Sequence, residues 1–203
     1  RAGRETLMAR IEDEAGPVDV LVNNAGLHHA ATLWDSPADT IAAQVELNLV
    51  VPLELCRQAV PRMVERGGGH LVNVSSLAAL ASVPGMTAYA ASKAGLSHGT
   101  AALREELHGL PIGVTTVLVG GVPTDLLEQG EAYAPFHAAF ERLRRIQLSP
   151  DTPPDVLAEA VVRGLLRDTR TVWLPRRAAP FVGLVEAPRR IVRLALTRVP
   201  RRA

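Results

Sequence analysis

The sequence predicts an α/β fold in which helices cover both faces of a doubly wound parallel sheet. Short apolar runs that are nearly continuous are typical of parallel strands buried on both faces. Segments with apolar residues at helical spacing separate these runs, and this alternation implies right-handed crossovers between parallel strands. A length of 203 residues with 47% hydrophobic residues allows one domain with a sizeable core.

Four apolar runs are predicted to form the strands, and we find no internal repeat among them. In chain order they are "VDVLVNNAG" (18–26), "GHLVNVSS" (69–76), "GVTTVLVGG" (113–121) and "RTVWLP" (170–175). The fourth run is shorter than the other three. Ligands bind at the carboxyl ends of the strands in such sheets, so the residues that close these runs are the first candidates for a site.

The first long helix is predicted over residues 36–66. Ser36 is a plausible N-cap, and Pro37 follows it near the start of the helix. Asn48 lies inside this segment although asparagine is a poor helix former. If Asn48 lies on the surface, the helix can tolerate it and no function is needed. The functional alternative is that Asn48 marks a local break in the helix that holds a water molecule.

Two further helices and one irregular region complete the predicted elements. Residues 87–109 form a helix that Gly109 and Pro111 close, and residues 153–168 form another that starts at two prolines. The region 125–150 is less regular and is predicted to be a helical insertion or lid. The chain also opens on a helical pattern, "RETLMARIEDEAG".

Composition and charge exclude several classes of protein. The formal net charge of +1 gives no signature of nucleic-acid binding, so no nucleic-acid partner is expected. The lone Cys56 cannot form an intrachain disulfide and favours a reducing compartment. We find neither an apolar run long enough for a transmembrane helix nor a signal peptide. These features favour a cytoplasmic protein.

Tyr89 and Lys93, the only lysine of the chain, open the helix that follows the second strand. They are four residues apart and therefore share a helix face. A lysine ammonium near a phenol favours the phenolate and lowers its pKa, so that the tyrosine can exchange a proton with a hydroxyl or carbonyl oxygen. An exposed helical pair without a role is the alternative, because this spacing alone is a weak signal.

Polar residues also close the first two strands. Ser75 and Ser76 end the second strand and are either turn serines or donors that polarise a substrate oxygen beside Tyr89. Asn23 and Asn24 end the first strand, where they either form a turn before Gly26 or tie strand ends together beside a cofactor. Together with "GGVPT" (120–124), which ends the third strand, four unusual stretches thus converge on one edge of the predicted sheet.

These stretches resemble the classical short-chain dehydrogenases/reductases. The matching segments are "VDVLVNNAG", "LNLVVP", "GHLVNVSS", "YAASKAGL" and "VGGVPTDL", in order and spacing from residue 18 to about 126. The resemblance implies a Rossmann-like sheet and hydride transfer between a nicotinamide and a carbinol or carbonyl carbon. It further implies NAD or NADP as the cofactor, and no metal.

The resemblance also implies a role for each matching residue. Tyr89 would be the general acid/base, Lys93 would lower the pKa of Tyr89 and bind the nicotinamide ribose, and Ser76 would bind the reacting oxygen. Asn48 would hold a water in the proton relay. The residues that would line the cofactor, besides Tyr89 and Lys93, are Asn23, Ala25, Gly26, Gly120, Val122 and Thr124.

The chain departs from the family pattern at its start. The glycine-rich phosphate loop that follows the first strand of the family is absent, and "RGGGH" (66–70) cannot replace it because those glycines precede a strand. We therefore expect that the natural N-terminus and the first strands of the dinucleotide-binding half are missing. The residues that select NAD or NADP would be missing with them. A further departure is Val119, where the family usually has proline.

Residues 1–175 are accordingly predicted to form a partial Rossmann-like catalytic domain, and several alternatives stay open. One is an epimerase or dehydratase of the extended family, which shares the Tyr89–Lys93 pair. Another is a non-catalytic binding protein of similar fold, or a fragment that is inactive by itself. The resemblance also implies a homodimer or homotetramer, formed through the helices equivalent to 40–66 and 87–109.

The substrate is expected to be a small, apolar, uncharged alcohol or ketone, steroid-like or fatty. The predicted pocket wall is apolar and carries few charges, with His28 and His29 as the exceptions that could have roles. Its residues are Leu80, Val83 and Met86, and from the lid Tyr133, Phe136 and Phe140.

The tail over residues 176–203 is predicted to be basic and amphipathic. It holds eight arginines against one acid, Glu186. Pro188 is expected to start a helix with a broad apolar surface, and Arg189, Arg190, Arg193 and Arg198 flank that surface, which is formed by Ile191, Val192, Leu194, Leu196 and Val199. Such a helix either makes peripheral contact with an anionic membrane, or it docks on the core of the domain or covers the substrate pocket with its apolar side.

Overall fold

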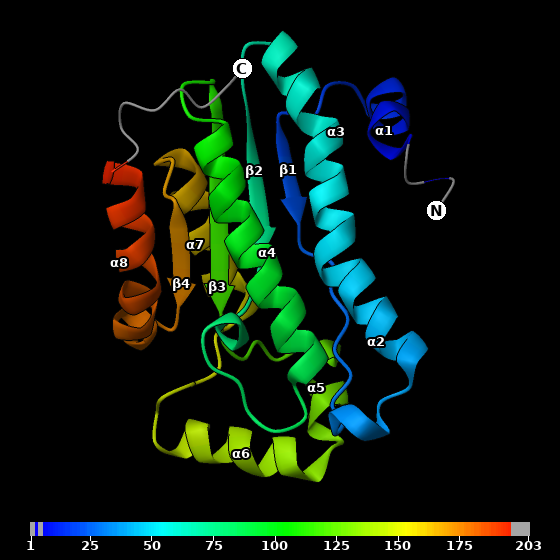
Figure 1. Cartoon of the computed structure of the whole chain (residues 1–203), viewed down its shortest axis with the longest axis vertical. Coiled ribbons are helices and arrows are strands. Elements are labelled where there is room, and N and C mark those ends of the chain that lie inside the picture. Colours follow the sequence, from blue (N-terminus) through cyan, green and yellow to red (C-terminus); the bar gives the residue numbers. More distant parts are fainter. Residues whose placement is uncertain (1–2, 4–5, 196–203) are drawn as a thin grey trace.

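A four-stranded parallel sheet forms the centre of the protein (Figure 1). The computed structural model describes residues 3 and 6–195. The strand order is β1-β2-β3-β4, with bounds Val20–Asn23, Gly69–Val74, Ile112–Val119 and Thr171–Leu174. Each strand starts within two residues of the start of its predicted run, so the predicted α/β fold with a parallel sheet is confirmed. Because the strands are parallel, their carboxyl ends meet at one edge.

Helices cover both faces of the sheet. On one face α3 (Val51–Glu65) and α4 (Thr87–Glu106) enclose a core with Leu71 of β2, and α1 (Leu7–Ala15) joins this core through Met8. On the other face α7 (Pro154–Leu166) packs on Val72 and Val117. Successive strand residues point to opposite faces, which explains why Leu71 and Val72 belong to different cores.

The α7 face is covered unevenly. Val22 lies opposite Val72 in the register and Val20 precedes it by two residues, so both side chains point toward the α7 side. They are 48% and 39% exposed. Among the described residues, then, the helices leave the β1 end of this face uncovered.

The predicted helix over residues 36–66 is found in three consecutive parts. α2 (Ala38–Val45) is followed by a π-helical segment, Glu46–Val50, and then by α3. The predicted N-cap is wrong, because the Ser36 hydroxyl donates to the carbonyl of Thr32 and Pro37 precedes the helix. The predicted local break is present, since the π-helical turn contains Asn48.

Two glycines bring α4 close to the π-helical segment and α3. A Cβ atom at Gly95 would lie 3.0 Å from Cδ2 of Leu49, and one at Gly99 would lie 3.4 Å from Cδ2 of Leu53. The approach at Gly95 is tight and the one at Gly99 is an ordinary contact, so a side chain larger than a methyl group at either position would disturb the packing. The close packing brings the side chain of Asn48 within hydrogen-bonding distance of Ser92 on α4.

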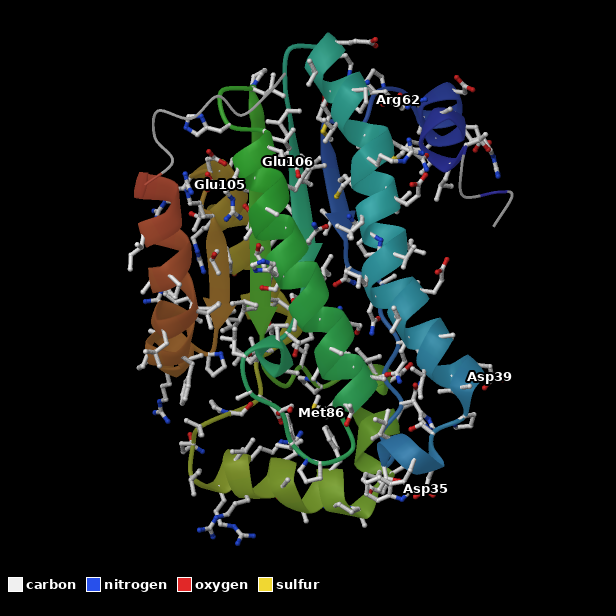
Figure 2. All side chains as sticks on the ribbon, in the orientation of Figure 1. Asp35, Asp39, Arg62, Met86, Glu105 and Glu106 are labelled. Carbon is white, nitrogen blue, oxygen red and sulfur yellow. The ribbon has the colours of Figure 1, made fainter. Side chains whose placement is uncertain are left out.

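The predicted insertion over residues 125–150 consists of α5 (Asp125–Glu131) and α6 (Ala134–Arg145). Figure 1 shows both helices at the edge of the sheet toward which the strand arrows point. Phe136 and Phe140 of α6 pack in one cluster with Met86 and Tyr89, and Figure 2 shows Met86 at the end of α4 that faces α6. The insertion therefore covers the edge at which the site is expected.

The C-terminal helix starts earlier than predicted. α8 runs over Ala179–Ala195 and contains Pro188 in its interior, so the expectation that Pro188 starts the helix is wrong. Its Val182 packs with Ala178 on Leu118 of β3, which brings the first part of α8 onto the sheet. Outside the described residues lie Leu196, Arg198, Val199 and the side chains of Arg189, Arg190, Val192, Arg193 and Leu194. Among the described helices, none has the length and apolar content to cross a membrane.

Candidate active site

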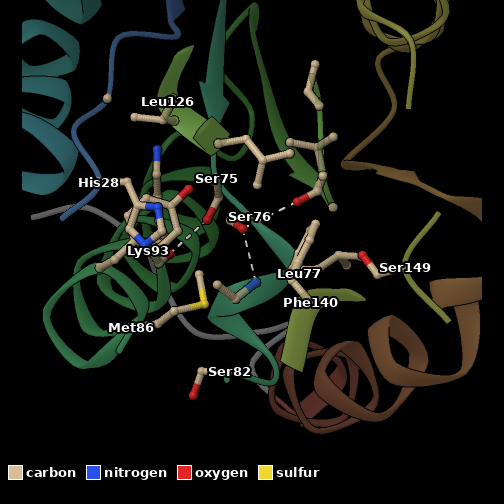
Figure 3. Close-up of a pocket in the computed structure, with 18 of the residues that line it drawn as sticks. His28, Ser75, Ser76, Leu77, Ser82, Met86, Lys93, Leu126, Phe140 and Ser149 are labelled. Atoms are coloured by element: carbon tan, nitrogen blue, oxygen red, sulfur yellow. Dashed lines mark hydrogen bonds between the residues drawn. The ribbon is translucent and has the colours of Figure 1, made fainter. Parts of the chain in front are cut away.

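A cavity of about 550 Å³ lies at the carboxyl edge of the sheet. Its walls come from the ends of β1, β2 and β3, from the start of α4, and from the α5–α6 insertion. Figure 3 shows His28 and Lys93 on one side of this cavity, Phe140 and Ser149 on the other, and Ser76 between them. The polar residues predicted to converge on one edge are therefore found around a single cavity, with the exceptions described below.

Tyr89 and Lys93 both line the cavity and are both buried, at 8% and 3% exposure. The alternative of an exposed helical pair is therefore excluded. The Nζ atom of Lys93 donates to the carbonyl of Val74 at 2.9 Å and lies 5.9 Å from the centre of the Tyr89 ring. The end of β2 thus holds the amine beside the tyrosine.

Burial dominates the proton affinities of this pair. Desolvation lowers the pKa of Lys93 to about 8. Desolvation also raises the pKa of Tyr89, and a side-chain hydrogen bond with Ser76 lowers it in part. The predicted net lowering of the Tyr89 pKa is therefore wrong for this pocket, because the loss of water outweighs the hydrogen bond with Ser76.

The two serines after β2 have different roles. Ser75 donates its hydroxyl to the carbonyl of Lys93 at 2.8 Å and so anchors α4 to the strand end. Ser76 lines the cavity, bonds with Tyr89, and accepts a hydrogen bond from the amide of Ala78 at 3.1 Å. Its hydroxyl also donates to the carbonyl of Val119 at 3.3 Å. Ser76 is thus the serine placed to meet a ligand together with Tyr89.

Asn48 lies behind the cavity rather than in its wall. Its Oδ1 accepts from the amide of Leu27, and its Nδ2 donates to the carbonyl of Leu27, both at 2.8 Å. Nδ2 also donates to the hydroxyl of Ser92 at 3.1 Å. Asn48 thereby joins the loop after β1 to α4, and its predicted role in holding a water stays a prediction.

Asn23 faces away from the cavity. Its Nδ2 donates to Oδ1 of Asn73 at 2.7 Å, and Asn73 in turn donates to the hydroxyl of Thr100 on α4 at 2.9 Å. The amides therefore tie β1, β2 and α4 together. Of the two interpretations of this strand end, the structure agrees with the one in which side-chain amides join neighbouring elements. Sequence reasoning missed Asn73, although its place opposite Asn23 in neighbouring parallel strands was a usable signal.

The predicted cofactor residues other than Asn23 line the cavity. Ala25 and Gly26 come from the end of β1, and Gly120, Val122 and Thr124 come from the loop after β3. A Cβ atom at Gly26 would lie 3.3 Å from Oδ1 of Asn48 and 3.5 Å from Nζ of Lys93, so a larger side chain would crowd both groups. These residues fit the nicotinamide end of a dinucleotide, because they leave backbone and the lysine amine accessible on one side of the cavity. Within residues 3 and 6–195 no cluster of metal-ligating side chains is found.

The predicted apolar wall is largely present. Leu80, Val83, Met86, Phe136 and Phe140 line the cavity. Tyr133 does not line it but packs behind the cluster of α6, where Gly85 leaves room for its ring. Sequence reasoning missed Ser149 and Phe181, because they come from an irregular turn and from the tail.

His28 lines the cavity, whereas His29 does not. The His28 ring is 4.6 Å from the Tyr89 ring and 5.2 Å from the Phe136 ring, measured between centroids. Its buried Nε2 has no hydrogen-bond partner among the described residues. Desolvation lowers the pKa of His28 to about 4, so the ring is neutral near pH 7. It contributes an uncharged ring to the wall beside Tyr89.

Comparison with known proteins finds one family throughout. The sequence profile described as short chain dehydrogenase matches residues 1–133. The probable oxidoreductase EphD of Mycobacterium tuberculosis is 38% identical over 132 residues, which are 64% of this chain and 22% of that protein. The ketoacyl reductase HetN of Nostoc sp. is 34% identical over 167 residues, 82% of this chain and 54% of that protein. The chain thus spans about a fifth to about half of these two relatives.

Solved structures share the fold over nearly the whole chain. A short-chain dehydrogenase from Streptomyces avermitilis is 27% identical with a TM-score of 0.74, and the match covers 98% of this chain and 75% of that one. A short-chain dehydrogenase from Sphingobium yanoikuyae, solved in complex with NADPH, has a TM-score of 0.77 at 23% identity. That match covers 98% of this chain and 73% of the other.

Proposed function

Because the chain belongs to the short-chain dehydrogenase/reductase family, we propose that the protein is an NAD(P)-dependent oxidoreductase acting on an apolar alcohol or ketone. The observation that carries the proposal is the convergence of Ser76, Tyr89 and Lys93 on one cavity at the carboxyl edge of the sheet. In this arrangement Ser76 would donate a hydrogen bond to the reacting oxygen of the substrate, Tyr89 would supply the proton, and Lys93 would supply a positive charge. When bound, the nicotinamide supplies or accepts the hydride.

Tyr89 is proposed to exchange the proton with the substrate oxygen. Burial raises its pKa, so Tyr89 is protonated near neutral pH and ready to act as an acid. This protonation state is the one required for carbonyl reduction, in which the tyrosine gives its proton to the developing alkoxide. Carbonyl reduction can therefore start from the protonated state of Tyr89.

Lys93 and Ser76 are proposed to support this transfer. With a pKa of about 8, Lys93 is mostly a cation at pH 7, and its positive charge stabilises the negative charge that forms on Tyr89. The hydroxyl of Ser76 lies beside Tyr89, and by rotating away from the carbonyl of Val119 it would donate to the same substrate oxygen. The two side chains thus act on both partners of one proton transfer.

The composition of the cavity wall supports an uncharged apolar substrate. Of the described residues that line the cavity, only Lys93 carries a charge at neutral pH, and it is engaged beside Tyr89. The remaining wall is mostly aliphatic and aromatic, with Phe136 and Phe140 stacked 5.3 Å apart. A phosphorylated or carboxylated substrate would enter this cavity without a counter-charge of its own, at a large desolvation cost.

The burial of Lys93 argues against a non-catalytic protein. Placing an ammonium in this cavity costs stability, as its lowered pKa shows. A binding protein that makes no use of the charge would lose nothing with an apolar residue here. The costly residue is better explained by a function in proton transfer.

Initial rates with a substrate panel test the proposed function. The protein should be assayed in its full-length context, with NADH and NADPH, against steroid-like ketones, long-chain ketones and phosphorylated sugars. We expect reduction of the apolar ketones because they match the wall of the cavity. Turnover of phosphorylated sugars alone would contradict the proposed substrate class, and no turnover with either cofactor would contradict the proposed activity.

A further inference from the structure

Exposed apolar side chains lie in the wall of the cavity and close to it in the chain. Leu148 and Phe181 line the cavity and are nevertheless 40% and 43% exposed, so they lie where it meets solvent. Ile146 and Leu184, close to them in the chain, are 53% and 74% exposed. We call these four residues the mouth surface.

A hydrogen bond holds the two segments of the mouth surface together. Arg177 precedes α8 and donates from Nη1 to the carbonyl of Gln147 at 3.2 Å. Gln147 lies between Ile146 and Leu148 in the turn after α6. The apolar side chains of this turn and those of α8 therefore form one surface rather than two separate patches.

Arginines frame the mouth surface. Arg142 and Arg145 at the end of α6, and Arg176 and Arg177 before α8, are exposed. The acids of the same stretch are Glu141 and Asp151, and both pair with Arg144, at 2.9 and 3.1 Å. The four exposed arginines thus give the rim of the mouth a positive charge, although the whole chain is nearly neutral.

We propose that the mouth surface docks on an anionic lipid layer, and that an apolar substrate passes from this layer into the cavity. Single exposed apolar residues are common, but here two lie in the wall of an apolar cavity, two more are close to them in the chain, and basic residues flank them in the sequence. Apolar side chains inserted at an interface and arginines paired with acidic headgroups are the two contributions that hold peripheral proteins on membranes. The docking stands by itself, whereas the substrate route rests on the proposed oxidoreductase function.

The proposed surface differs from the one that the sequence predicts. Membrane contact is one of the alternatives for the helix predicted to start at Pro188, and the side chains of most of its apolar positions lie outside the described residues. The structure instead offers Ile146 and Leu148 after α6 together with the first turns of α8. Docking through this surface would bring the cavity entrance to the lipid.

Vesicle sedimentation with the full chain tests the docking without any need for turnover. Vesicles of phosphatidylcholine and phosphatidylglycerol in equal amounts are compared with vesicles of phosphatidylcholine alone. The two test variants are Ile146→Ser with Leu184→Ser, and Arg176→Ala with Arg177→Ala. The matched control is Val162→Ser with Leu166→Ser, which removes two exposed apolar residues from α7.

We expect the protein to bind the anionic vesicles, to leave them in high salt, and to bind neutral vesicles far less. Each test variant should bind about tenfold less, while the control binds as the unmodified protein does. Equal binding to both kinds of vesicle, or unchanged binding of the test variants, would overturn the proposal. Loss of a self-associated form in the test variants, without vesicle binding, would also overturn it and show a contact between two copies. None of these outcomes depends on catalysis, so failure here leaves the proposed activity intact.

Discussion

Replacing Tyr89 with phenylalanine is expected to lower turnover about a hundredfold to ten-thousandfold, which is the usual contribution of general acid–base catalysis. The ring of Tyr89 packs with Met86, Phe136 and Phe140, and phenylalanine preserves this packing. The hydroxyl alone is lost, together with its bond to Ser76. Binding of the cofactor should therefore change little, and steady-state rates with calorimetric titration separate the two effects.

Tyr133→Phe is the matched control for this variant. Tyr133 is the only other tyrosine of the chain, and it belongs to the same apolar cluster without lining the cavity. We expect Tyr133→Phe to keep nearly the full rate. A Tyr89→Phe protein that retained more than half of the rate would rule out Tyr89 as the acid.

Replacing Lys93 with methionine is expected to abolish turnover and to remove a pH dependence of stability. The pKa of Lys93 is about 8 in the folded protein and 10.5 in its unperturbed form. Between these values the unfolded chain binds the additional proton, so the free energy of unfolding rises with pH across this window. The full difference corresponds to about 3 kcal/mol, and below pH 8 the cost of burying the charge is fully present.

Two other groups lower the free energy of unfolding as pH rises. The effect of Lys93 must therefore be measured as the difference between the unmodified protein and Lys93→Met. Burial raises the pKa of Cys56 from 9.0 to about 11, and it also raises the pKa of Tyr89, so both destabilise the fold as pH increases. Subtracting the unfolding free energy of Lys93→Met from that of the unmodified protein cancels these contributions. Denaturant unfolding at several pH values should show that the unfolding free energy of the unmodified protein rises, relative to that of Lys93→Met, from pH 8 upward. A difference that is flat, as expected for the exposed control Arg163→Met, would contradict the buried position of the Lys93 charge.

Much of the fold is predictable because its signals are local. Each strand is a continuous apolar run, and the turn signal at Gly109 and Pro111 follows α4 closely. Local signals fail to predict the start of a helix where tertiary contacts determine it. The predicted cap at Ser36 is wrong because its hydroxyl bonds back to Thr32, and α8 starts before Pro188 because Ala178 and Val182 can pack on Leu118.

The candidate site divides in the same way. The spacing of Tyr89 and Lys93 places both on one helix face, and the strand ends place Ser76 beside them, so sequence alone identifies this group. The direction of the Tyr89 pKa shift depends on how much water the α5–α6 insertion excludes, and no motif encodes that. Asn48 is identified by its poor helix propensity, but its bonds to the backbone of Leu27 require the three-dimensional contact between the β1 loop and the π-helical turn.

Transfer of deuterium tests the central claim most directly. The full-length protein should reduce an apolar ketone in ordinary water with a reduced nicotinamide cofactor that carries two deuterium atoms at its reactive carbon, and mass spectrometry should follow the product. If the cavity around Ser76, Tyr89 and Lys93 is a hydride-transfer site, the deuterium appears on the carbinol carbon of the alcohol, and Tyr89→Phe suppresses its appearance. An alcohol without deuterium on that carbon, or an unchanged yield from Tyr89→Phe, would contradict the account.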